Sequence, residues 1–146
     1  MQEPGFFNRK KTDDYFLEVI AMIIFVSGFR YDIVVKRWPD IFKAFDCFSV
    51  EKVSLYDERK IAKLLTNEKI IRNRKKIAAI INNACKLREI KKEHGSVKKW
   101  IDWVFKRFRE NPVENDHPID YGSRSFERIG EKTIKWFYWS AGKKVD

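Results

Sequence analysis

The chain has 146 residues, a length that suits one compact domain and leaves little room for two. Apolar residues make up 44% and charged residues 36% of the sequence, which excludes a disordered chain. The 31 Lys and Arg residues against 21 Asp and Glu residues give a formal net charge of +10, which favours a polyanionic partner or an anionic surface.

The cysteine pattern and the apolar runs exclude further classes of protein. Cys47 and Cys85 are far apart and form no CxxC pair, so neither a disulfide scaffold nor a cysteine-rich zinc module fits. The longest apolar run, residues 19–26, is far shorter than the roughly 18 residues of a membrane span. Residues 1–5 show no basic start ahead of an apolar stretch, so no secretory signal is expected. These features predict a reduced, soluble, cytoplasmic protein with no membrane partner.

Apolar residues recur at helical spacing through the first half of the chain, and capping residues precede them. The first helix is predicted over residues 12–26, and a serine and a glycine end it. A second helix is predicted over residues 32–45, with a break or restart near Pro39. Ser49 and Asp57 have the cap chemistry of two short helices.

The second half of the chain predicts longer helices. A turn at residues 67–74 precedes an amphipathic helix over 74–90, and another helix follows over 96–108. Residues 111–122 hold two prolines and several turn formers, so they are predicted to be a loop. A final helix is predicted from Ser123 or Ser125. No segment alternates with period two long enough for a strand, so the fold class is all-α, a single compact helical domain over residues 1–146.

Residues 64–77 have apolar residues on both sides of a tight turn, and the turn opens a basic helix. A helix start exposes unpaired backbone N–H groups and a partial positive charge, which together favour a phosphate group. Five cations surround this point: Lys69, Arg72, Arg74, Lys75 and Lys76. The pattern predicts a helix-hairpin-helix motif that holds the DNA backbone without reading its sequence. The alternative is a solvated basic helix face.

Two segments carry a more specific pattern. The first includes Gly28-Phe29-Arg30-Tyr31, Lys36-Arg37, Ile70-Ile71-Arg72-Asn73-Arg74, Lys76-Ile77 and Asn83-Ala84. The second includes Phe126, Ile129-Gly130, Phe137 and Ala141-Gly142. Together they resemble the 3-methyladenine DNA glycosylase I family of helix-hairpin-helix base-excision enzymes. The resemblance covers about residues 13–84 and the last helix.

This resemblance implies a DNA wedge and a base pocket. The wedge would be Gly28 and Phe29 with Arg30 beside them, because the family inserts a side chain here into the gap left by the extruded nucleotide. Tyr31 stands where the family has a tryptophan that stacks on the flipped base. For Phe29 and Tyr31 the alternative is ordinary core packing after a helix break.

Several positions depart from the family pattern. Ile23 replaces a carboxylate that recognises the modified adenine, so the pocket formed by Ile23, Phe25 and Tyr31 is expected to be more apolar. The family's zinc-binding segments at the two ends are not found, so no metal or other cofactor is expected. Lys69 and Lys75 stand where the hairpin pattern prefers glycine.

The expected function is removal of alkylated purines such as 3-methyladenine from double-stranded DNA, in base-excision repair, by a monomer associated with the nucleoid. An N3-alkylated adenine is a cation that leaves its sugar readily, so an aromatic pocket that captures it supplies much of the catalysis. Trp136 and Trp139 are further candidates for the pocket lining. The sequence marks no catalytic acid or base, because Glu93 and Asp102 lie in no recognisable motif and Asp32, next to Tyr31, is expected to cap the second helix. The alternatives are a catalytically inactive DNA-binding relative and an RNA-binding or basic interaction module.

Overall fold

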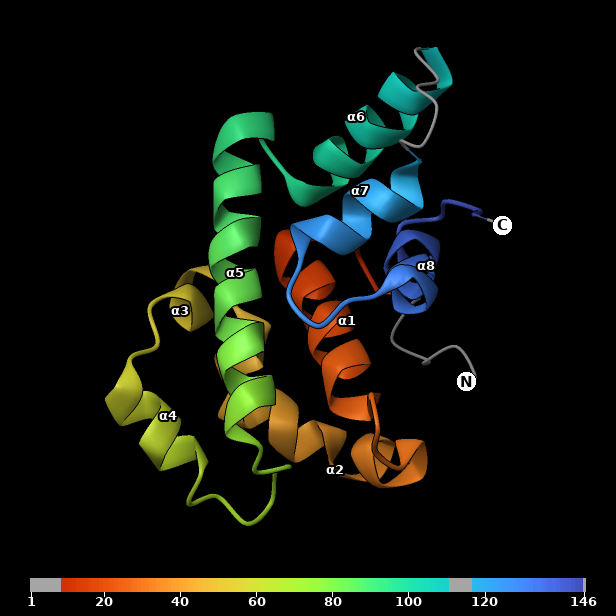
Figure 1. The fold of residues 1–146 in the computed structure, drawn as a ribbon. Coiled ribbons are helices and arrows are strands. Elements are labelled where there is room, and N and C mark those ends of the chain that lie inside the picture. The colour runs from red at the N-terminus through yellow and green to blue at the C-terminus, as the bar shows by residue number, and fades with distance from the viewer. Residues whose placement is uncertain (1–8, 111–116, 146) are drawn as a thin grey trace.

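The computed structural model describes residues 9–110 and 117–145, whose regular structure is helical throughout (Figure 1). The elements are α1 (Asp13–Val26), α2 (Tyr31–Ala44), the 3-10 helix η2 (Asp46–Phe48), α3 (Val50–Ser54), α4 (Glu58–Leu64), α5 (Arg74–His94), α6 (Val97–Glu110), α7 (Pro118–Ser125) and α8 (Glu131–Ser140). These ranges contain no strand, so the all-α prediction is confirmed. None of their helices is long and apolar enough to cross a membrane.

Helix α1 is the centre of the core. Its residues from Tyr15 to Phe25 are all buried, on every side of the helix. Figure 1 shows α1 between the long helix α5 and the C-terminal helix α8, and α1 packs against both. A helix that is apolar all round must be enclosed by other elements. Helices α2, α3, α5, α6 and α8 and the 3-10 helix η2 pack against α1, whereas α4 packs on α5 and α7 packs on α6 and α8.

The observed helix starts agree with the cap residues read from the sequence. The Thr12 hydroxyl accepts a hydrogen bond from the Tyr15 amide at 3.1 Å, and the Asp57 carboxylate accepts one from the Lys60 amide at 3.0 Å. Helix α2 is continuous through Pro39, so the break or restart predicted near this proline does not occur. Val35, whose carbonyl loses its helical partner to the proline, is exposed, so water can satisfy that oxygen.

The prediction of a loop over residues 111–122 is wrong where the structure describes it. Residues 111–116 lie outside the described ranges, but α7 begins at Pro118. Proline suits the first turn of a helix because its missing N–H has no partner there in any case. The His117 side chain caps this start by accepting a hydrogen bond from the Ile119 amide at 3.2 Å.

The predicted start of the last helix is also wrong, because residues 123–125 end α7 and α8 begins at Glu131. Gly122 lies inside α7, where a Cβ atom would collide with the hydroxyl of Tyr138 on α8. That hydroxyl donates a hydrogen bond to the carbonyl of Pro118 at 2.6 Å. A glycine that appeared to be a loop former therefore serves the close approach of two helices.

One carboxylate lies within this apolar core. Glu18 on α1 is 2% exposed and accepts hydrogen bonds from the Trp38 indole at 2.8 Å and from the Arg9 guanidinium at 2.8 and 3.0 Å. Burial raises the pKa of Glu18, although the bonds from Trp38 and Arg9 act in the opposite direction. The site ties the start of the described chain and α2 to the central helix.

Glu18→Gln is expected to remove a pH-dependent part of the stability. Because burial raises the pKa of Glu18 in the folded state above its unfolded value near 4.5, the folded state binds the proton more tightly. The contribution of this group to the free energy of unfolding therefore falls as the pH rises above that value. The neutral amide can still accept the bond from Trp38 and does not titrate. Urea unfolding at several pH values should show the wild type losing stability relative to the variant as the pH rises, and a constant difference would contradict this.

Candidate nucleic-acid interface

Two turns lie together at one end of the molecule. The first, residues 27–30, joins α1 to α2, and the second, residues 65–73, joins α4 to α5. Both lie at the lower end in Figure 1. The Arg37 guanidinium on α2 donates to the Ile70 carbonyl in the second turn at 3.4 Å. The fold thus brings the predicted wedge and the predicted phosphate-binding hairpin to the same end.

The wedge turn presents an aromatic ring to solvent. Gly28 has a φ of +68° with no heavy atom within 4 Å of an ideal Cβ, so its backbone conformation rather than crowding favours glycine. The Phe29 amide donates to the Val26 carbonyl at 3.0 Å, and the Phe29 ring is 45% exposed. The alternative of core packing therefore does not apply to Phe29. Arg30 pairs with Asp32 at 2.8 Å, and both side chains are exposed.

The three predicted pocket residues differ in accessibility. Ile23 is 3% exposed, and Phe25 is completely buried, with its ring 5.9 Å from that of Phe45 and 6.3 Å from that of Trp38. Ile23 and Phe25 are therefore core residues in this structure, and neither side chain is accessible to a ligand. Tyr31 is half-buried at the first position of α2, directly after the wedge turn.

The prediction that Lys76 binds a DNA phosphate is wrong, because its side chain is not accessible. Its side chain is buried, and its ammonium donates to the carbonyl of Ser27 at 2.7 Å and to that of Phe25 at 3.0 Å. The same ammonium lies 5.7 Å from the centre of the Phe29 ring. Burial lowers the pKa of Lys76, and the charge of Arg128 adds to this effect. Lys76 fastens the wedge turn to the first turn of α5.

The other hairpin cations are at the surface. Lys69, Arg72 and Lys75 are exposed, and Arg74 is exposed but pairs with Glu58 at 2.8 Å. The hairpin is anchored by Ile70 and Ile71, which are buried. Four of the five predicted phosphate-binding residues are therefore accessible.

Two asparagine side chains shape the turn over residues 65–73. The Asn67 side chain accepts a hydrogen bond from the Lys69 amide at 2.9 Å and so closes the turn. Asn73 caps α5 by accepting one from the Lys76 amide at 3.0 Å. These local bonds explain how the chain makes the turn with lysine at positions 69 and 75.

Two of the three acidic residues considered for catalysis lie far from these turns. Glu93 is near the end of α5, about 28 Å along the helix axis from its start at the usual rise per residue. Asp102 is on α6, where Lys98 and Lys143 contact it at 2.8 and 2.9 Å. Burial alone would raise the pKa of Asp102, but these two lysines outweigh it and lower the pKa. Only Asp32 is close to the wedge.

The described residues do not provide a metal site like the family's zinc site. In residues 9–110 and 117–145 no three His, Cys, Asp or Glu side chains lie close enough to hold an ion. Cys47 and Cys85 are free thiols on different elements, and both are exposed.

Most of the chain matches one known protein family. The family model described as methyladenine glycosylase matches residues 5–134. The chain belongs to this family. The membership confirms the resemblance read from the sequence and places the chain among the 3-methyladenine DNA glycosylase-like enzymes.

Solved structures of 3-methyladenine DNA glycosylase I have the same fold as this family member. A variant in complex with 3-methyladenine is 22% identical, with a TM-score of 0.75 over 89% of this chain and 77% of that one. The Staphylococcus aureus enzyme, described for its recognition of 3-methyladenine, is 22% identical, with a TM-score of 0.74 over 91% and 78% of the two chains. A further structure of the enzyme is 21% identical, with a TM-score of 0.72 over 91% and 80%. The roles of the individual residues in this chain stay predictions.

Lys76→Met is expected to destabilise the protein by about 1–3 kcal/mol, because the carbonyls of Phe25 and Ser27 lose a charged donor. Lys75→Met is the matched control, since Lys75 is the exposed neighbour on the same helix turn. The control should change the free energy of unfolding in urea by less than about 0.5 kcal/mol. Equal effects of the two substitutions would show that the buried contacts contribute nothing.

Proposed function

We propose that this family member is a base-excision glycosylase that flips an alkylated purine such as 3-methyladenine out of double-stranded DNA and hydrolyses its bond to the sugar. The observation that carries the proposal is the exposed Phe29 ring, held beside the basic hairpin by the buried ammonium of Lys76. Membership of the methyladenine glycosylase family supports it. A monomeric protein in the cytoplasm, associated with the nucleoid, belongs to the same proposal.

Each accessible element has a role in this account. The start of α5, with Lys69, Arg72 and Lys75 around it, binds backbone phosphates and fixes the position of the protein on the duplex. The Phe29 side chain enters the stack where the damaged nucleotide leaves it. Tyr31, the next accessible aromatic residue along the chain, stacks on the extruded base.

The hydrolysis needs little acid catalysis when the base is an alkylated cation. The bond between the sugar C1′ and the base nitrogen breaks, and its electron pair neutralises the charge of the leaving base. A water oxygen then bonds to C1′, releases a proton and leaves an abasic site. An aromatic face favours a cationic ring by about 1–2 kcal/mol when it is desolvated. Normal bases carry no such charge and leave slowly.

An inactive DNA-binding relative is the second candidate, and the environment of residue 23 favours it. The family has a carboxylate that recognises the adenine at this position, whereas Ile23 is apolar and 3% exposed. Such a protein would keep the hairpin and the wedge and would bind damaged DNA without cleaving the sugar bond. The two candidates differ in one product, the free base.

Incubation with methylated duplex DNA is therefore expected to release free methylated purine and leave an equal amount of abasic sites. Chromatography of the released bases, with methylated adenines and guanines measured separately, identifies the preferred lesion. Binding to a duplex with an abasic analogue is measured in parallel, and single-stranded RNA of equal length is the competitor. Tight duplex binding without base release would support the inactive relative, and equal RNA binding would favour a basic interaction module.

Substitutions in the pocket and in the hairpin should separate chemistry from binding. Tyr31→Ala is expected to lower single-turnover base release by about 10- to 100-fold, the loss of one stacking contact, while duplex affinity changes little. The double variant Lys69→Glu/Arg72→Glu should weaken duplex binding more than it lowers base release at saturating protein. The slope of log K against log[salt] should become about 2 less steep, because two phosphate contacts are lost. Arg88→Glu with Lys92→Glu, the same charge change on the second half of α5, is the control. Equal effects of the two double variants would contradict the assigned hairpin role.

A further inference from the structure

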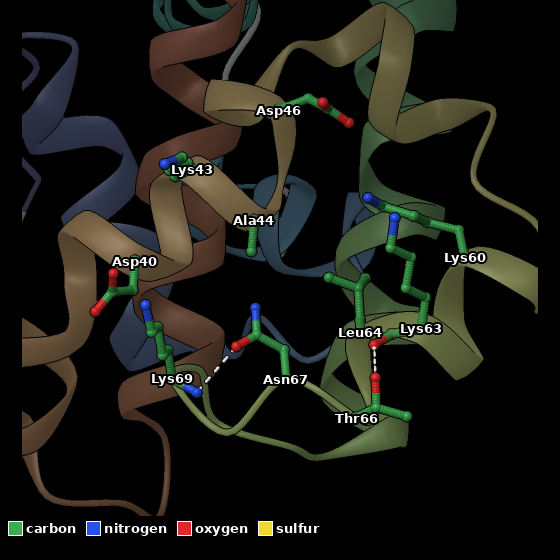
Figure 2. A pocket seen from close by; sticks show the side chains of 10 residues that line it. All are labelled: Asp40, Lys43, Ala44, Asp46, Lys60, Lys63, Leu64, Thr66, Asn67 and Lys69. Atoms are coloured by element: carbon green, nitrogen blue, oxygen red, sulfur yellow. Dashed lines mark hydrogen bonds between the residues drawn. The ribbon is translucent and has the colours of Figure 1, made fainter.

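A lysine-rich hollow lies next to the hairpin, and of the residues that line it only Lys69 has a role in the function proposed above. Figure 2 shows it between α2 on one side, α4 on the other and residues 66–69 of the hairpin at its edge. Its volume is about 540 Å³, within the range of pockets that hold small molecules. Neither Ile23 nor Tyr31 lines it, so it is distinct from the proposed base site.

Four lysines from three elements converge on this hollow. Lys43 comes from α2, Lys60 and Lys63 from α4, and Lys69 from the hairpin. Lys60 and Lys63 are three residues apart on one helix and therefore lie on the same face. None of the ion pairs found within residues 9–110 and 117–145 involves any of these four ammonium groups.

The two carboxylates of the hollow, Asp40 and Asp46, offset only part of the charge of the four lysines. Asp46 accepts a short hydrogen bond from the hydroxyl of Tyr56, and Asp40 comes from the opposite wall to α4. Burial and the Asp46 carboxylate raise the pKa of Tyr56, so its hydroxyl keeps the proton that it donates. Figure 2 shows Asp40 near Lys69 and away from Lys60 and Lys63. Within the described residues no ion pair joins Lys60 or Lys63 to a carboxylate, and four lysines against two aspartates leave the hollow with net positive charge.

We propose that this hollow binds phosphate groups of the DNA strand that continues beyond the hairpin. The inference rests on the proposed function, because it takes the hairpin as the point where the backbone first binds. Thr66, Asn67 and Lys69 belong both to the hairpin and to the edge of the hollow, so a strand held at the hairpin runs directly onto the lysines. Lysine is a mobile point charge that suits a phosphate whose position varies with DNA sequence.

A second basic hollow provides a matched control. It has a volume of about 530 Å³ and includes Arg88, Lys91 and Lys92. Arg88 is about 21 Å along α5 from the helix start at the usual rise per residue, so this hollow is remote from the hairpin. Substitutions there change the net charge equally without touching the proposed strand path.

The test compares Lys43→Gln/Lys60→Gln/Lys63→Gln with Arg88→Gln/Lys91→Gln/Lys92→Gln. The probe is a fluorescent duplex with a tetrahydrofuran abasic analogue, titrated by anisotropy at several KCl concentrations. The first variant is expected to bind about tenfold or more weaker and to reduce the salt slope by about 2, because two or three phosphate contacts are lost. The control should reduce the slope by less than about 1.

Base release at saturating protein distinguishes this inference from the proposed function. The first variant should release base at the wild-type rate, since its three lysines do not line the base site. If the wild type releases no base but the two variants still differ in binding, the glycosylase proposal fails and the strand-binding hollow stands. Equal duplex affinity of the two triple variants, or wild-type affinity of the first, would contradict the proposal that the hollow binds the DNA strand. Far-UV circular dichroism of both variants checks that the helices are intact.

Discussion

The candidate site depends on one buried ammonium group. Lys76 is in the first turn of α5, and its side chain reaches the last carbonyls of α1 and the turn beyond it. The C-terminal end of a helix carries partial negative charge, so a cation there is stabilised as well as hydrogen-bonded. Because the contact joins the start of α5 to the turn after α1, the two elements with proposed DNA-binding roles are held in a fixed position relative to each other.

The rest of the fold makes this contact possible. Helix α1 is buried on all sides and α5 packs along it. This packing places the C-terminal end of α1 next to the N-terminal end of α5. At the same end, Arg37 ties α2 to the hairpin through the Ile70 carbonyl. The positions of the two turns therefore come from helix packing, whereas Lys69, Arg72 and Lys75, the cations proposed to bind phosphates, are exposed at the surface. A rigid scaffold with charged side chains at its surface is suited to binding the sugar–phosphate backbone of DNA, whatever the base sequence.

The sequence predicted the features that depend on neighbouring residues. Thr12 and Asp57 cap helices by bonds to residues three positions away, so local pattern was sufficient to find them. The buried partners of Lys76 are about 50 positions earlier in the chain, and a lysine among other basic residues gives no sign of them. Phe25 was assigned to the pocket for a similar reason, because only the packing of Trp38 and Phe45 shows that it is enclosed. The local pattern does not predict helix α7, because Pro118 and Gly122 break helices in most sequence contexts.

The exposure of Phe29 has a consequence for the energetics of DNA binding. Its ring is in contact with water before any duplex arrives, and the turn that carries it is already closed by the bond to Val26. Insertion between bases would remove apolar surface from water without first ordering the backbone, so the entropy lost on binding is small. If Phe29 acts as the proposed wedge, its turn already has the required backbone conformation in the free protein, and insertion would relieve the unfavourable hydration of its ring.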